Sequence, residues 1–174
     1  IDDIASDDMV KKWSPDGDQP WMDEINNFTF TSTNGGPNGL WKYNYEGIKR
    51  TNIALSFLLN PDIEKITGIT TDRKNQLIGE AYFLRSNYYF SLVTNFGDVP
   101  LILAPVKTYQ EAFDFAVRSP KEEVWNQIKT DLGKAKTLLP NSKYGSNTEK
   151  WRVSKGAVIA LLAKTALYNK DWAT

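Results

Sequence analysis

One stretch, residues 79–101, constrains the fold of this chain more than any other. It reads GEAYFLRSNYYFSLVTNFGDVPL, and with the residues just before it carries two adjoining apolar stripes. Both stripes repeat every three or four residues, which is the spacing of a helix face. The stripes are Leu77, Ala81, Leu84, Tyr88 and Leu92, and Ile78, Tyr82, Tyr89, Val93 and Phe96. So wide a face predicts a helix from about Asp72 to Asn95 that is packed on most of its circumference.

Three residues of this stretch carry further predictions. Gly97 can take the positive φ angle that ends a helix, and Pro100 prevents the helix from resuming. Arg85 lies among aromatic residues, so we expect its stem to be buried and its planar head group to stack or form an ion pair. The aromatic rings themselves are interpreted as core packing.

A second long helix is predicted to begin at Leu40 and to end at Asn60-Pro61. Its apolar face repeats at steps of three and four residues. The face consists of Trp41, Tyr45, Ile48, Asn52, Leu55 and Leu59. Asn52 is polar on this face, so a buried Asn52 amide must find hydrogen-bond partners.

Two more helices are predicted from their start signals. Ser119 is the expected cap of the first, with Pro120 in the first helical position and Glu122 completing a capping box. Ser154 is the expected cap of the other, which continues to Asn169. Four helices in two hairpins, with caps 35 positions apart, predict an all-α, tetratricopeptide-like stack with longer loops than that repeat normally has.

The first 38 residues show no sustained period, and we expect an irregular segment there. Residues 14–20 are rich in turn-forming residues, and a short helical turn around 4–12 is possible. Residues 27–32 are expected to be briefly extended, and residues 33–39 to form a loop. So long an irregular stretch is usually functional or wrapped over the surface.

Composition excludes several function classes. Lys+Arg and Asp+Glu both number 21, so no net charge favours nucleic acid or an anionic membrane surface. The sequence has no His and no Cys, which removes Ser-His-Asp catalysis, thiol nucleophiles and the usual zinc ligands. No stretch approaches eighteen consecutive apolar residues, so no membrane span is predicted.

Weaker motifs do not support a metal, phosphate or catalytic site. Asp16-Gly17-Asp18 lacks the alternating ligands and the distal Glu of a calcium loop. The glycines at 35–39 lack the Gly-Lys-Ser/Thr ending of a phosphate loop. No pair of carboxylates is singled out for glycoside hydrolysis. We therefore expect neither a cofactor nor enzymatic activity.

The candidate ligand-binding residues are Trp13, Asp16, Asp18 and Trp21. An indole in an irregular, polar segment is not part of the apolar face of a helix. Its ring can therefore remain exposed and stack on the apolar C–H face of a sugar. Asp16, Asp18 and the nearby Lys12 could then bond the sugar hydroxyls. The alternative interpretation is that Trp13 or Trp21 fastens the N-terminal segment to the core.

Several stretches of the helical part of the chain resemble motifs of the SusD/RagB family. Its hallmark helix is similar to Gly79-Glu80-Ala81, Phe83-Leu84-Arg85, Tyr88-Tyr89-Phe90 and Phe96 to Leu101. Its W-Y-I-aN pattern is similar to Trp41, Tyr45, Ile48, Arg50 and Asn52. Further similarities are Ser119-Pro120, Asp131-Leu132, Arg152 to Ala157 and Leu161 to Lys164. The matches extend from about Trp41 to Trp172, which is most of the chain.

The resemblance implies a non-catalytic, surface-exposed lipoprotein of the outer membrane of Bacteroidetes. Such proteins bind a glycan or oligosaccharide and deliver it to a TonB-dependent, SusC-like transporter. In starch-binding members an aromatic platform lies shortly before the W-Y-I-aN helix, where Asp7-Asp8 and Trp13 fall here. Members are several times longer and carry a lipidated Cys. We therefore expect residues 1–174 to be a single N-terminal domain of a larger protein, with 1–38 irregular and 39–174 helical.

Two alternatives remain open at the level of the sequence. A RagB-like member would bind peptides, and a deep acidic or basic groove would favour that function. A generic helical-repeat module would bind a protein partner. An exposed, flat aromatic platform would favour sugar binding over both.

Overall fold

The computed structural model describes residues 3–6, 19–141, 149 and 151–172, and within them it contains seven helices and two two-residue strands. This confirms the all-α prediction. The chain divides into two compact units, residues 1–43 and 44–174, which are described separately. Among the described residues, no helix is both long and apolar enough to cross a membrane.

The first unit contains helix α1 (Pro20–Asn26) and the first turns of α2 (Gly35–Leu58). Asn34 caps α2, because its side-chain Oδ1 accepts a hydrogen bond from the Gly36 backbone N at 2.8 Å. The Asn34 amide also donates to the Trp21 carbonyl oxygen at 3.0 Å and to Glu24 Oε2 at 2.7 Å. One buried amide thus joins the two helices of this unit.

Several predictions for the N-terminal segment were wrong. Residues 20–26 form a helix rather than irregular structure, and residues 27–32 contain no strand. The glycines at 35–39 begin α2 instead of forming a loop, so this helix starts five residues before Leu40. The physical reason is the Asn34 cap together with Pro37, whose missing N–H costs nothing in a first turn. The expected turn around 4–12 and the turn at 14–20 lie largely outside the described residues.

In the second unit, α4 (Thr71–Phe96) confirms the predicted central helix to within one residue at each end. The Thr70 side chain caps its start by accepting from the Arg73 backbone N, and Gly97 ends it with a φ of 68°. The stripe that contains Tyr82 and Tyr89 is the more deeply buried one, since Leu84 in the other stripe is partly exposed. α4 is thus the helix on which the unit is built.

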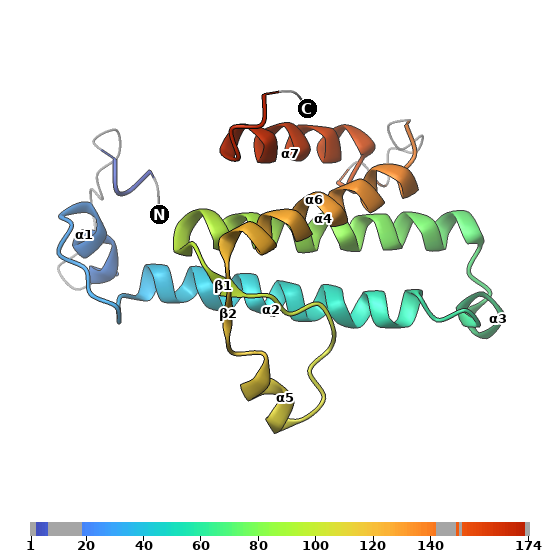
Figure 1. Ribbon diagram of the computed structural model, residues 1–174, viewed down its shortest axis with the longest axis horizontal. Helices are drawn as coiled ribbons and strands as arrows, with labels where there is room; N and C mark the ends of the chain where they lie inside the picture. The colour runs from blue at the N-terminus through green and yellow to red at the C-terminus, as the bar shows by residue number, and fades with distance from the viewer. Residues whose placement is uncertain (1–2, 7–18, 142–148, 150, 173–174) are drawn as a thin grey trace. The chain divides into compact units, whose positions relative to one another are not determined.

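The sequence analysis missed the short elements that connect the long helices. Helix α3 (Ile63–Thr67) connects α2 to α4, and α5 (Tyr109–Asp114) follows the strand β1 (Val99–Pro100). β1 pairs antiparallel with β2 (Arg118–Ser119). The pair closes the base of a long loop that carries α5, as Figure 1 shows.

Helices α6 (Lys121–Leu138) and α7 (Lys155–Tyr168) complete the unit, with α6 packed along α4 and α7 packed on α6 (Figure 1). The Ser154 cap is confirmed, because its side chain accepts from the Ala157 backbone N. The Ser119 cap was wrong. Ser119 is engaged in β2, and Asp98 Oδ1 instead accepts from the Lys121 backbone N at 2.9 Å.

An ion-pair network fastens the residues before α7 to α4. Arg73 on α4 contacts Glu149 at 2.9 Å, and Glu149 also pairs with Arg152 at 3.0 Å. Arg152 in turn reaches Glu80 on α4 at 2.6 Å. The Arg73 hydrogen bond is the main cause that holds the pKa of Glu149 below its ordinary value.

Candidate functional site

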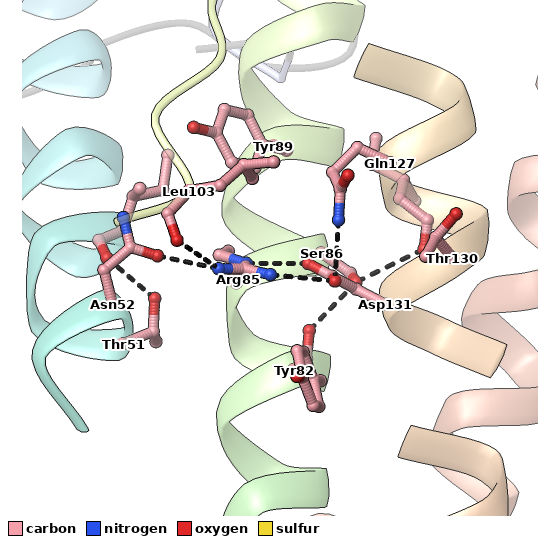
Figure 2. Close-up of polar contacts among 12 residues, drawn as sticks. Thr51, Asn52, Tyr82, Arg85, Ser86, Tyr89, Leu103, Gln127, Thr130 and Asp131 are labelled. Carbon is pink, nitrogen blue, oxygen red and sulfur yellow. Dashed lines mark hydrogen bonds and ion pairs between the residues drawn. The ribbon is translucent and has the colours of Figure 1, made fainter. Parts of the chain in front are cut away.

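The centre of the second unit holds a buried ion pair between α4 and α6. Arg85 donates from Nε to Asp131 Oδ2 at 2.7 Å and from NH2 to Oδ1 at 2.9 Å, and both side chains are buried (Figure 2). Gln127 also donates to Asp131 Oδ1, at 2.8 Å. The two-pronged geometry is the one in which a guanidinium binds a carboxylate most strongly. This confirms the prediction that Arg85 is buried and that its head group stacks or forms an ion pair.

Arg85 also reaches the opposite side, toward α2 and the segment that follows β1. Its NH1 donates to Asn52 Oδ1 at 2.9 Å and to the Leu103 carbonyl oxygen at 3.2 Å (Figure 2). The Asn52 amide donates to the carbonyl oxygens of Ile102 at 2.9 Å and Ala104 at 3.3 Å. The expectation that a buried Asn52 must find partners is therefore confirmed.

Two tyrosines bind the same segment. The Tyr89 hydroxyl accepts from the Ile102 backbone N at 2.7 Å and donates to its carbonyl oxygen at 2.9 Å. The Tyr45 hydroxyl donates to the Pro100 carbonyl oxygen at 2.8 Å. Burial is the main cause that raises the pKa of both tyrosines, so both hydroxyls remain protonated donors at neutral pH.

We call these five residues, Tyr45, Asn52, Arg85, Tyr89 and Asp131, the polar clamp. Residues 101–104 follow β1 and have no pairing strand in the part of the chain that the structure describes, and side chains of the clamp bond the carbonyl oxygens of Pro100, Ile102, Leu103 and Ala104. Among the described residues, no buried side-chain nitrogen or oxygen lacks a hydrogen-bond partner. A network so fully satisfied fixes one arrangement of the segment.

The clamped segment forms one side of a cleft between α2 and α5. This α2–α5 cleft has a volume of about 590 Å³ and is lined by Ile53, Ser56, Phe57, Ala104, Pro105, Lys107, Glu111 and Phe115. A smaller cavity of about 210 Å³ adjoins it, because Ile53, Ala104 and Pro105 line both. Asn52 of the clamp lines the smaller cavity.

A separate apolar cavity of about 510 Å³ lies among the end of α2, α4 and α6. Its lining includes Leu58, Ile78, Tyr82 and Lys134. The Lys134 ammonium lies 5.0 Å from the centre of the Tyr82 ring, which is a cation–π contact. The polar side chains of Asn60, Lys74, Asn75 and Thr137 also line this cavity.

The structure describes one of the four candidate ligand residues. Trp13, Asp16 and Asp18 lie outside the described residues. Trp21 lies in α1, where its half-buried ring packs against Gly36. A Cβ at Gly36 would lie 2.9 Å from that ring and 2.6 Å from Ile25. Because the structure describes only Trp21 of the four residues, the candidate ligand site stays a prediction.

Sequence reasoning missed Phe57, Phe115, Lys107 and Glu111 as candidate site residues. Phe57 lies between Leu55 and Leu59 in the sequence of α2, and Phe115 lies 58 positions later. No local sequence pattern therefore connects the two phenylalanines. The one available signal was Phe57, an aromatic residue that does not belong to the predicted apolar face of its helix. Among the described residues, no group of three or more His, Cys, Asp or Glu side chains could hold a metal ion.

Comparison with known proteins places the chain in a family. The family model described as SusD-like, starch-binding and associating with the outer membrane matches residues 3–167. The chain belongs to the SusD-like family. A SusD-like protein P2 of Formosa agariphila is 33% identical over 151 residues, which cover 86% of this chain and 27% of that protein. The predicted family resemblance is thus confirmed.

Solved structures of SusD-like proteins have the same fold. A laminarin-binding SusD-like protein superposes with a TM-score of 0.75 at 31% identity, over 88% of this chain and 31% of its own. Surface glycan-binding protein A from Bacteroides fluxus has a TM-score of 0.78 at 26% identity, over 97% of this chain and 34% of its own. The SusD-like chain described here therefore spans about a third or less of the length of these relatives.

Proposed function

We propose that this SusD-like chain is part of a non-catalytic glycan-binding protein. The observation that carries the proposal is its 31% identity, over 88% of its length, to a structure described as laminarin-binding. A second relative is described as a surface glycan-binding protein. Within residues 1–174, the lack of His and Cys means that the commonest nucleophile–base pairs cannot be built from these residues alone.

The proposed ligand residues are Trp13, Asp16, Asp18 and Trp21. An exposed indole offers a flat apolar face to a pyranose ring, and the two carboxylates accept hydrogen bonds from its hydroxyls. Trp21 can contribute through the part of its ring that is not packed against Gly36. A hydroxyl-rich, uncharged ligand also suits a chain with no net charge.

Calorimetric titration of the intact protein with laminarin, starch and a peptide mixture tests this proposal. We expect heat from a glycan, and we expect Trp13→Ala to weaken binding tenfold to a hundredfold, since a lost indole stack costs about 1–3 kcal/mol. Trp151→Ala is the matched control, because Trp151 is 78% exposed and lies far along the chain from Trp13. Heat from peptides alone would instead indicate a RagB-like function.

We further propose that the protein is a surface-exposed lipoprotein that delivers its ligand to a TonB-dependent, SusC-like transporter in the outer membrane. The family description, which associates these proteins with the outer membrane, supports this location. The helical stack would face the transporter, and the loops would face the ligand. Affinity purification of the tagged protein from its host's outer membrane should recover a TonB-dependent transporter. Recovery of no such transporter would contradict delivery while leaving glycan binding intact.

A further inference from the structure

The α2–α5 cleft has the dimensions and composition of a small-molecule site. Its volume of about 590 Å³ falls within the roughly 300–1,000 Å³ range that is usual for ligand pockets. Such pockets combine apolar or aromatic walls with a few placed polar groups. The cleft does so with residues from α2, from the clamped segment and from α5.

Two phenylalanines give the cleft its aromatic surface. Phe57 on α2 is 64% exposed although it is fully apolar, and Phe115 at the end of α5 is half-buried. Both line the same cleft although they come from different elements. Exposed ring faces of this kind are suited to the apolar C–H face of a pyranose, as they are to other flat apolar groups.

The polar groups of the cleft select among such ligands. Lys107 and Glu111 bring one positive and one negative charge to the same lining. Glu111 is fixed there, because its Oε2 accepts from the Lys107 backbone N at 2.6 Å and its backbone N donates to Thr108 Oγ1 at 3.2 Å. An ammonium donor and a carboxylate acceptor in the same lining match hydroxyl groups, which both donate and accept. A charged ligand would be attracted by one of the two and repelled by the other, so the pair gives it no net electrostatic advantage over a neutral one.

The polar clamp makes one wall of the cleft rigid before any ligand arrives. Ala104 lines the cleft, and its carbonyl oxygen accepts from the buried Asn52 amide. Asn52 is held in turn by Arg85, which is paired with Asp131. A wall that is already ordered lowers the entropic cost of binding.

We propose that the α2–α5 cleft is a second saccharide subsite, which binds a short stretch of a neutral oligosaccharide against Phe57 and Phe115. The proposal rests on the glycan-binding function proposed above, but it uses residues other than Trp13, Asp16, Asp18 and Trp21. Lys107 donates to the sugar hydroxyls, and Glu111 accepts from them. The ligand class is a neutral glucan or a similar uncharged oligosaccharide.

Methyl NMR of the intact protein, with laminarihexaose and maltohexaose as probes, tests this subsite directly. Ile53 lines the cleft and the adjoining cavity, so its δ1 methyl resonance should shift in a saturable way with one of the two sugars. Ile66 is an exposed control methyl that does not line the cleft, and its resonance should stay in place. A bound sugar that leaves the Ile53 methyl unmoved would overturn the proposal.

Alanine variants provide the second arm of the test. Phe57→Ala and Phe115→Ala should each weaken the apparent affinity at the Ile53 methyl roughly tenfold, because an aromatic ring contact is lost. Phe113→Ala is the matched control, since Phe113 lies on α5, is 71% exposed and does not line the cleft. Equal affinities in all three variants would contradict the subsite.

The two proposals fail in different ways. If the protein binds glycans through the Trp13 segment alone, Trp13→Ala weakens binding tenfold to a hundredfold. The Ile53 methyl resonance then does not shift, and Phe57→Ala leaves the affinity unchanged. If the protein binds no glycan, no probe shifts any methyl resonance and calorimetry detects no heat. The first outcome overturns the cleft subsite only, and the second overturns the function on which it rests.

Discussion

The polar clamp and the α2–α5 cleft lie on the same extended segment, but they use their side chains in opposite ways. In the clamp, charged and polar groups are buried and bond to backbone carbonyl oxygens or to each other. In the cleft, the Phe57 ring is exposed, the Phe115 ring is half-buried, and charged side chains line an open volume. The clamp thus holds the backbone of the segment, and Ala104 of the same segment lines the cleft.

This difference separates stability from recognition within a small region. A buried ion pair is sensitive to the loss of one partner, because the remaining charge is left without compensation. An exposed ring contributes little to folding, since water already reaches it. Substitutions in the clamp should therefore change the free energy of unfolding, and substitutions in the cleft should change ligand affinity.

The largest expected effect is that of Asp131→Ala. This change leaves the buried Arg85 guanidinium without its carboxylate, and removing one partner of a buried pair typically costs about 3–5 kcal/mol. Urea denaturation followed by circular dichroism measures the loss. Asp62→Ala is the control, because its ion pair with Lys65 is exposed on the surface and is worth about 0–1 kcal/mol. Equal losses in the two variants would contradict the role of the clamp.

A smaller effect is expected for Asn52→Ala. The change removes the amide donor for the carbonyl oxygens of Ile102 and Ala104 and one acceptor for Arg85, so we expect a loss of about 1–3 kcal/mol. The same variant should broaden the Ile53 methyl resonance, because the wall of the cleft loses its fixed position. Unchanged stability in urea would show that water replaces the lost amide without cost.

Phe57→Ala should separate the two regions most clearly. The ring is largely exposed, so we expect the free energy of unfolding to change by no more than about 0.5 kcal/mol. Thermal melting of the variant beside Asp131→Ala measures this contrast. A loss as large as that of Asp131→Ala would mean that Phe57 belongs to the core rather than to a ligand surface.

The smallest effect concerns pH and the ion pairs before α7. The Arg73 hydrogen bond lowers the pKa of Glu149, so this carboxylate adds stability at pH values above its ordinary pKa of 4.5. That contribution is lost as the pH falls below 4.5 and through the lowered pKa of the folded state. Melting temperatures between pH 3 and 7 should therefore fall less steeply for Glu149→Gln than for the unmodified protein. If the melting temperatures of the two proteins fell in parallel with pH, the ionisation of Glu149 would not contribute to stability.

The sequence predicted the elements whose signals are local. The apolar stripes and Gly97 predicted α4 to within one residue at each end, and Ser154 predicted the start of α7. Arg85 was expected to be buried and either to stack or to form an ion pair, because it lies among aromatic residues. Its partner, Asp131, lies 46 positions later, and helix periodicity does not identify which of 21 acidic residues it is.

The predictions that were wrong depended on contacts between distant residues. Ser119 has the sequence signature of a cap, but pairing with Val99 places it in a strand, and Asp98 supplies the cap instead. The glycines at 35–39 have the composition of a loop, but the Asn34 cap allows them to form the first turn of α2. Phe57 and Phe115 line the same cleft although they lie 58 positions apart, so only the folded chain places them together.

A crystal structure of the intact protein with a bound glucan oligosaccharide would test most directly whether this protein recognises sugars through exposed aromatic rings. We predict sugar rings stacked on Trp13 and in the α2–α5 cleft against Phe57 and Phe115. The Arg85–Asp131 contacts at 2.7 and 2.9 Å should remain unchanged. Sugar hydroxyls bonded to Arg85 or Asp131, or a ligand bound away from every one of these aromatic rings, would contradict the account.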